Sequence, residues 1–229
     1  MNFDDLNEIK EKLELCEKLG IKNLILEPKD DIENISLEFK RIIKNITKIN
    51  IYYRHTLKPD NLQDFKKRIK RFNNYPEILS VETSNKDIQI HAVRDSRVDL
   101  ISFSHPEMIK TLTNGVISLA KQNNSFIELS LSSIMVKNRS IQSKNFRYLY
   151  RFIYKVRNLK ANYILSGDFN ELFDIRHPRA LISICYTLLD IPLAEIKRAF
   201  KENPVRLLKR IEKRQNNAIL ENGVKLIKE

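Results

Sequence analysis

The chain has 229 residues, 42% of them hydrophobic, which is enough to build one barrel or two small domains around a real core. Its 41 Lys and Arg residues outnumber 29 Asp and Glu residues, and the formal net charge of +12 predicts attraction to polyanions, with nucleic acid as the first candidate. Only Cys16 and Cys185 are present, which excludes a disulfide framework or a zinc cluster and predicts reduced, buried thiols. No apolar stretch has the length of a signal peptide or membrane span, so we expect a cytoplasmic protein without a membrane partner.

Helical and strand patterns alternate through the first half of the chain. In order, we expect a helix with Leu6, Ile9, Leu13 and Cys16 inward, a strand at 24–26, a helix at 39–46, a strand at 49–56, a helix at 62–72 and a strand at 78–83. Gly20 is a natural stop for the first helix. Each unit takes about 25 to 30 residues, which is the size of a βα repeat.

The alternation continues through the second half. We expect a short helix at 87–93, a strand at 98–104, one helix with Met108, Leu112, Val116 and Leu119 inward, a strand at 126–136, a helix at 141–159, a strand at 163–166 and a helix carrying Leu181, Ile184, Cys185 and Leu188. Two more helical segments begin near Pro192 and Pro204, and Asn203 is the expected N-cap of the second.

Six strands alternating with helices predict an α/β fold with a parallel sheet. The regular spacing and the absence of a linker favour a single TIM-barrel-like domain over residues 1–229, with 192–229 as C-terminal helical segments and tail. A doubly wound open sheet is the alternative. Its dinucleotide-binding form would need clustered glycines in the first βα turn, whereas the four glycines here are scattered.

The strongest local charge signal is residues 137–160, which contain eight Lys and Arg residues and no acidic residue. Lys144, Arg147, Arg151 and Lys155 fall on one helix face, and a different, core-facing arc is expected to hold Phe146, Leu149, Tyr150 and Ile153. Two interpretations stay open, a solvated outer face and a surface that tracks phosphates. Basic runs at 66–71 and 197–214 are interpreted first as solvated helix faces and second as auxiliary RNA contacts.

Two short segments place charges at strand and helix junctions, where barrels carry functional groups. One is Arg97-Val98-Asp99 ahead of an apolar strand, and the other is Asp174-Ile175-Arg176-His177-Pro178-Arg179 at a helix start. Together with the order of helices and strands, they resemble the thirty-kilodalton protein subunit family of ribonuclease P, also called RNase P protein component three. The resemblance covers roughly residues 8–215.

That resemblance implies a TIM-barrel-like (PHP-like) fold, related to the polymerase-and-histidinol-phosphatase class of metal hydrolases but without its metal site. It implies a non-catalytic subunit that stabilises the RNase P RNA, so that Mg²⁺ bound by the RNA removes 5′ leaders from pre-tRNA. The protein itself would bind no cofactor, and its expected protein partner is the Pop5-related subunit at the barrel rim. The family usually opens with a strand before its first helix. Residues 1–6 supply at most a remnant of it, so the barrel is expected to be open or closed by other means.

Motif position and local charge together give a set of candidate RNA contacts: Arg94, Arg97, His105, Lys137, Lys144, Arg147, Arg151, Arg176 and Arg179. Structural ion pairs are the competing interpretation for two of them. Arg97 could pair with Asp95 or Asp99, and Arg176 could pair with Asp174.

Two other functions remain as alternatives. A stand-alone PHP-like metal-dependent phosphoesterase would need several His and carboxylate ligands, typically with a His-x-His near the first strand. The four His residues here are scattered and include no such motif. A general RNA-binding module without a fixed partner is the other alternative.

Overall fold

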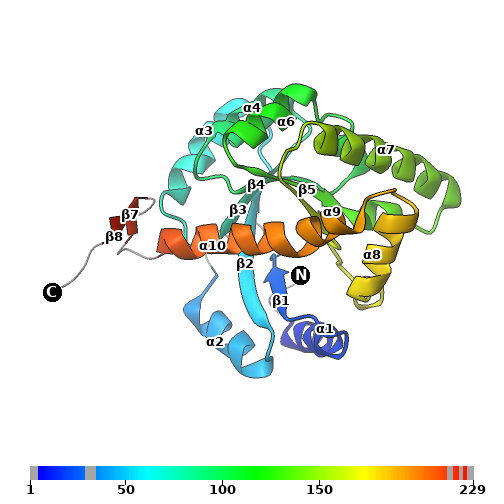
Figure 1. Ribbon diagram of the computed structural model, residues 1–229. Coiled ribbons are helices and arrows are strands. Elements are labelled where there is room, and N and C mark those ends of the chain that lie inside the picture. Colours follow the sequence, from blue (N-terminus) through cyan, green and yellow to red (C-terminus); the bar gives the residue numbers. More distant parts are fainter. Residues whose placement is uncertain (1–4, 29–34, 216–218, 222–223, 226–229) are drawn as a thin grey trace.

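The computed structural model describes residues 5–28, 35–215, 219–221 and 224–225, and its core is one parallel sheet. The strands, which lie side by side in chain order, are β1 (Asn23–Leu26), β2 (Asn50–Leu57), β3 (Ile78–Glu82), β4 (Leu100–Phe103), β5 (Phe126–Ser130) and β6 (Tyr163–Ser166). Figure 1 shows the sheet curled, with helices around its outside. This half-barrel confirms the TIM-barrel-like prediction. It contradicts the doubly wound alternative, in which the strand order reverses.

Helices connect the strands and cover the convex side of the sheet. They are α1 (Leu6–Lys18), α2 (Leu37–Ile46), α3 (Leu62–Arg68), α4 (Lys86–Arg94), α5 (Pro106–Ile109), α6 (Asn114–Gln122), α7 (Arg139–Asn158) and α8 (Pro178–Thr187). Gly20 adopts a φ of 72°, a left-handed conformation that suits glycine, so its predicted role at the end of α1 is confirmed. Residues 1–4, where a remnant of an earlier strand was expected, lie outside the described ranges.

Two elements between residues 106 and 136 are shorter in the structure than the sequence predicts. The single helix expected to carry Met108 to Leu119 is instead α5 and α6, because the Thr113 side chain accepts a hydrogen bond from the Val116 amide and starts a new helix. The strand expected at 126–136 ends at Ser130 and continues as a 3₁₀ turn, η2 (Leu131–Ile134). Lys137 therefore lies in a connection, several residues beyond the end of β5.

The chain after Pro192 forms one continuous helix rather than two segments. It comprises α9 (Leu193–Lys197), the π-helical turn η4 (Arg198–Glu202) and α10 (Asn203–Gln215). Asn203 is helical and is not an N-cap, and its amide instead donates to the Tyr163 carbonyl of β6 at 2.7 Å. The wider turn accommodates Pro204, which has no N–H to donate. Beyond this helix, β7 (Ile219–Glu221) pairs antiparallel with β8 (Val224–Lys225).

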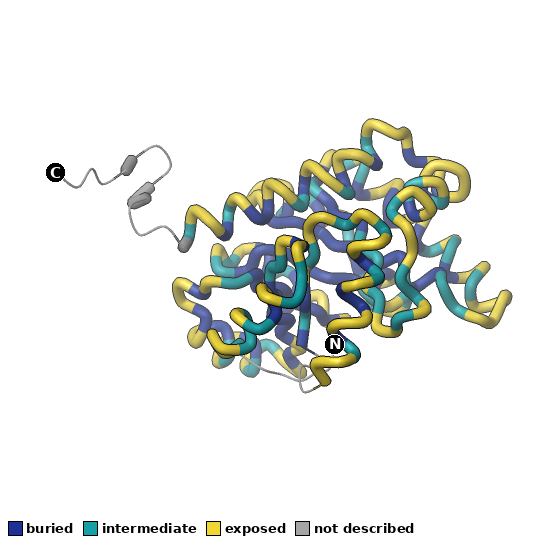
Figure 2. Tube along the Cα trace, turned by 90° about the horizontal axis from the view of Figure 1, so that it is seen from below, coloured by how far each residue is buried: buried dark blue, intermediate teal, exposed yellow. Residues whose placement is uncertain are grey.

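Residues on the two faces of the sheet pack into different clusters. Residues that point outward pack under the helices in the main core, among them Leu79, Val81, Ile101 and Leu129. At the amino ends of the strands, the inward residues Ile78, Leu100, Phe126 and Ile164 pack instead against Leu207, Leu208 and Ile211 of α10. Figure 1 shows α10 running across this region, and Figure 2 shows the buried strands inside a shell of half-exposed helices. The apolar face of α10 thus closes one end of the half-barrel.

Within the described ranges, no helix combines the length and the apolar character needed to cross a membrane.

Candidate nucleic-acid interface

Six of the nine predicted contact residues lie at the two ends of the sheet. His105 follows β4, Lys137 precedes α7, and Arg176 and Arg179 lie between β6 and the first turn of α8. All four follow the carboxyl ends of strands, which is the end where barrels carry their functional groups. Arg94 and Arg97 precede β4 and therefore lie at the amino end. The structure does not bring these two groups together.

Helix α7 carries the other three residues, Lys144, Arg147 and Arg151, on its exposed side. No carboxylate in the described part of the chain forms an ion pair with any of them. The opposite side of α7 is buried through Asn145, Leu149, Phe152, Ile153 and Val156. Tyr150 was predicted to face the core, and that prediction is wrong, because its side chain is 43% exposed. The outer face of α7 therefore presents both cations and an aromatic ring.

Polar contacts hold the beginning of α7 against the sheet. The Asn138 side chain accepts hydrogen bonds from the backbone amides of Ser140 and Ile141, which caps the helix. The buried Asn145 amide donates to the carbonyl of Ser133 in η2 at 2.6 Å. These contacts fix the connection in which Lys137 lies, and Lys137 itself is exposed.

The second motif forms a tight connection ahead of α8. His177 caps this helix by accepting a hydrogen bond from the Arg179 amide at 3.0 Å, and Pro178 occupies its first turn. The Arg176 guanidinium donates to the carbonyls of Phe173 and Ile175, and no described ion pair joins it to Asp174. Arg176 and Arg179 are both exposed, so their charges remain available to an anion.

Arg97 is held by its neighbours. Its guanidinium makes two hydrogen bonds to Asp95, at 2.8 and 2.7 Å, and a third to Asn73 at 3.0 Å. Burial of Asp95 opposes ionisation, but the hydrogen bonds from Arg97 outweigh it and lower the pKa of this carboxyl. The structure thus shows the ion pair between Arg97 and Asp95, which was one of the two interpretations of Arg97. Arg94, by contrast, is exposed at the end of α4.

Asp99 of the first motif has a structural role that the sequence did not reveal. Its fully buried carboxylate accepts hydrogen bonds from the Leu79 amide at 3.0 Å and from Arg214 at 3.2 and 3.0 Å, and Arg210 lies at 3.4 Å. Arg214 and Arg210 belong to α10 and were interpreted first as solvated. They instead fasten α10 to the amino ends of the strands.

A second unpredicted network lines the concave side of the sheet. Arg54 of β2 forms ion pairs with Glu128 of β5 at 2.6 Å and with Glu27, which follows β1, at 3.1 Å. Burial opposes the charge of Glu128, but the Arg54 charge and a hydrogen bond from Ser102 lower its pKa. The sequence carries a sign of this polar lining, because Ser80 and Glu82 in β3, and Glu128 and Ser130 in β5, alternate with apolar residues.

At the carboxyl end of the same surface, Glu82 pairs with Lys58 at 3.0 Å and accepts a hydrogen bond from Ser104. The nearby Asp168 has a raised pKa, first because the carboxyl is desolvated and second because Glu128 is negative. The Glu82 carboxylate at this end of the barrel is thus engaged by groups of the protein itself.

The histidines have different environments and do not share one site. His55 is buried and stacks on the Phe72 ring with centroids 4.9 Å apart, whereas His105 is exposed and His177 caps α8. Among the residues that the structure describes, no group of three or more His, Cys, Asp or Glu side chains is arranged to hold a metal ion.

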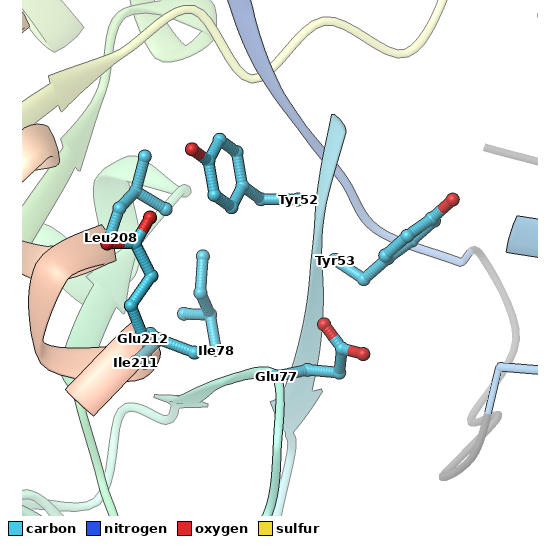
Figure 3. Close-up of a pocket in the computed structure, with 7 residues that line it drawn as sticks. All are labelled: Tyr52, Tyr53, Glu77, Ile78, Leu208, Ile211 and Glu212. Carbon is cyan, nitrogen blue, oxygen red and sulfur yellow. The ribbon is translucent and has the colours of Figure 1, made fainter. Parts of the chain in front are cut away.

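A small pocket lies between α10 and β2. Figure 3 shows Tyr52, Ile78 and Leu208 facing one another there, with Glu77 and Glu212 at its edge. Its lining is apolar and acidic, which does not suit a polyanion. The candidate interface is therefore on α7 and the carboxyl-end connections rather than in this pocket.

Comparison with known proteins agrees with this architecture. The family model described as RNase P subunit p30 matches residues 2–216. A chain in the cryo-EM structure of archaeal Ribonuclease P with mature tRNA superposes with a TM-score of 0.83 at 19% identity, covering 96% of this chain and 95% of that chain. Ochratoxinase of A. niger superposes with a TM-score of 0.50 at 12% identity, covering 84% and 49%. No curated protein matches by sequence. The half-barrel described above thus belongs to the RNase P subunit p30 family.

Proposed function

We propose that this chain binds and stabilises the catalytic RNA of ribonuclease P in the cytoplasm, for removal of 5′ leaders from pre-tRNA. Membership of the p30 family supports the choice of particle. The observation that carries the RNA contact is the exposed row of cations on α7, which has no ion-pair partner in the described part of the protein.

Electrostatics favours an anionic partner for this row. Lys144, Arg147 and Arg151 are spaced three and four residues apart, so their charges repel one another. A phosphate backbone relieves that repulsion and releases its own counterions on binding. Guanidinium groups can also hold phosphate oxygens with two parallel hydrogen bonds. Arg176 and Arg179 extend the same kind of surface to the connection before α8.

The interior of the half-barrel supports a non-catalytic role for the protein. Glu27 and Glu128 are both engaged by the Arg54 guanidinium, and Glu82 is engaged by Lys58. Carboxylates neutralised in this way are poor candidates for acid-base work. In this proposal the protein binds no cofactor of its own, and Mg²⁺ held by the RNA performs the hydrolysis.

Other protein subunits complete the proposed particle. The exposed Phe173 ring stands in the connection between β6 and α8, at the carboxyl end of the barrel. An aromatic side chain in that position suits burial against another protein. We assign the Pop5-related subunit to this rim.

Reconstitution tests the function. Leader removal is measured at low and high Mg²⁺ with RNase P RNA and its other proteins, with this chain present or omitted. We expect omission to abolish activity at low Mg²⁺, because the RNA then lacks cations that neutralise its backbone. The variant Arg147→Ala/Arg151→Ala should behave like omission. Lys10→Ala/Lys18→Ala, which loses the same charge from α1, should behave like the parent.

Equal activity with and without the chain at every Mg²⁺ concentration would reject the proposed role. RNA that copurifies from cells provides an independent check. One discrete abundant RNA supports the RNase P particle, whereas a broad mixture supports a general RNA-binding module.

A further inference from the structure

Two tyrosines interrupt the row of cations on α7. Tyr150 is 43% exposed and Tyr154 is 55% exposed, and they alternate with Arg147, Arg151 and Lys155 on the outer side of the helix. We call these five residues the α7 stripe. It contains no acidic residue, and none occurs anywhere in residues 137–160.

Packing does not explain the exposure of these rings. Leu149, Phe152 and Ile153 already form the buried side of α7 that packs in the core. In the described part of the chain, neither Tyr150 nor Tyr154 takes part in an aromatic pair, and neither hydroxyl has a hydrogen-bond partner. Two large aromatic faces are therefore left in water beside guanidinium groups. This combination favours nucleic acid, because bases stack on aromatic rings while cations hold phosphates.

The spacing of the rings indicates which form of RNA fits. Tyr150 and Tyr154 are four residues apart, which places their Cβ atoms about 5–6 Å from each other. Adjacent bases of a stacked strand are in contact with each other, so two rings at this spacing can stack on bases only where the bases are splayed apart. A duplex also hides the base faces on which the rings would stack.

We propose that the α7 stripe binds an unpaired segment of RNA, with Tyr150 and Tyr154 stacking on splayed bases while Arg147 and Arg151 hold the flanking phosphates. The inference rests on the proposed function and adds the class of RNA element that this face recognises. The tyrosines contribute contacts that depend little on salt, and the arginines contribute the salt-dependent part.

Binding of the full-length chain to RNase P RNA at several salt concentrations tests the inference. Tyr150→Ala and Tyr154→Ala should each weaken binding about 5-fold or more with little change in salt slope, because a base stack is lost. Tyr154→Phe keeps the aromatic face and should restore binding. Tyr186→Ala removes a similarly exposed ring from α8 and serves as the matched control.

A fluorescent probe gives a direct readout of stacking, because the natural chain contains no Trp. In Tyr154→Trp, we expect quenching by a single-stranded oligoribonucleotide and much less by the duplex of the same sequence. Equal quenching by both, or none by either, overturns the inference.

The outcomes separate this inference from the proposed function. If Arg147→Ala/Arg151→Ala weakens RNA binding but both Tyr→Ala variants bind like the parent, the inference fails and the function stands. If none of these variants changes RNA binding, both fail for this face. If the other RNase P proteins change the Trp signal while RNA does not, the stripe is a protein interface and the inference is overturned.

Discussion

Replacing Asp99 with Ala tests how the C-terminal helix is attached to the barrel. The buried carboxylate receives hydrogen bonds from the Leu79 amide and Arg214, and it is paired with Arg210. Asp99→Ala therefore removes the acceptor of the Leu79 amide and the counter-charge of both guanidinium groups. Arg214 still donates to the Glu77 carbonyl and Arg210 to the Ser96 carbonyl. The apolar contacts of α10 with the strand ends stay in place, so we expect a folded but weakened protein.

The size of the loss follows from burial. Removing one partner of a buried ion pair costs roughly 3–5 kcal/mol. The side chains of Arg214 and Arg210 keep 19% and 30% of their exposure, so water can partly solvate them in the variant. We therefore expect the lower end, about 3 kcal/mol. For a chain of this size, that corresponds to a fall in Tm of roughly 6–12 °C.

Thermal and urea unfolding followed by far-UV circular dichroism measures the loss. Glu107→Ala removes a solvent-exposed pair with Lys110 and should leave the stability almost unchanged, which makes it the matched control. In Asp99→Ala/Arg214→Met, the losses should be less than additive, because both changes disrupt the same contact. The reasoning is refuted if Asp99→Ala unfolds within about 2 °C of the Glu107→Ala control.

Three further predictions concern charge and burial. Arg176→Ala should lower the slope of log affinity for RNA against log salt by about 0.7–0.9, whereas Arg97→Ala should leave it unchanged because its guanidinium is held by a carboxylate. The pKa of Glu128 is lower in the folded protein than its ordinary value of 4.5. Its ion pair therefore stabilises the fold fully at pH values above 4.5, and the stabilisation is lost as the pH falls through the pKa of the folded state. The difference in unfolding free energy between the parent and Glu128→Gln should therefore be largest near neutral pH and shrink below pH 4.5, and a constant difference would contradict this. Burial raises the pKa of both thiols, of Cys185 to about 12, so a thiol reagent at pH 8 should label Cys16 and Cys185 only on unfolding, and rapid labelling of the native protein would contradict their burial.

Most of the fold could be predicted from the sequence, because its elements follow local periodicity. The predictions fail where one local sequence pattern is compatible with two structures. Thr113 caps a helix inside a continuous apolar stripe. Asn203 looks like an N-cap next to Pro204, yet its side chain is used by the edge of β6. Tyr150 sits at the border of the apolar arc of α7, and a shift of a few tens of degrees moves it from core to surface.

The candidate site was predictable only in part, for a different reason. The motifs located the connections that carry Arg176 and Arg179, and composition located the basic helix. Partners that are remote in sequence leave no local signal, so Asp99 could not be assigned to Arg214, which is 115 residues later. The polar lining around Arg54 did leave a signal in the alternation of the strands.

The attachment of α10 to the strand ends also affects how the protein folds during synthesis. Asp99 and Arg214 are separated by 115 residues, which a ribosome adds in roughly 6–23 s at typical rates. Throughout that interval the nascent sheet has one uncovered apolar end and an acid without its counter-charge. The half-barrel can therefore reach its native state only when the last helix has emerged, and a chain truncated before that helix should be a substrate for chaperones.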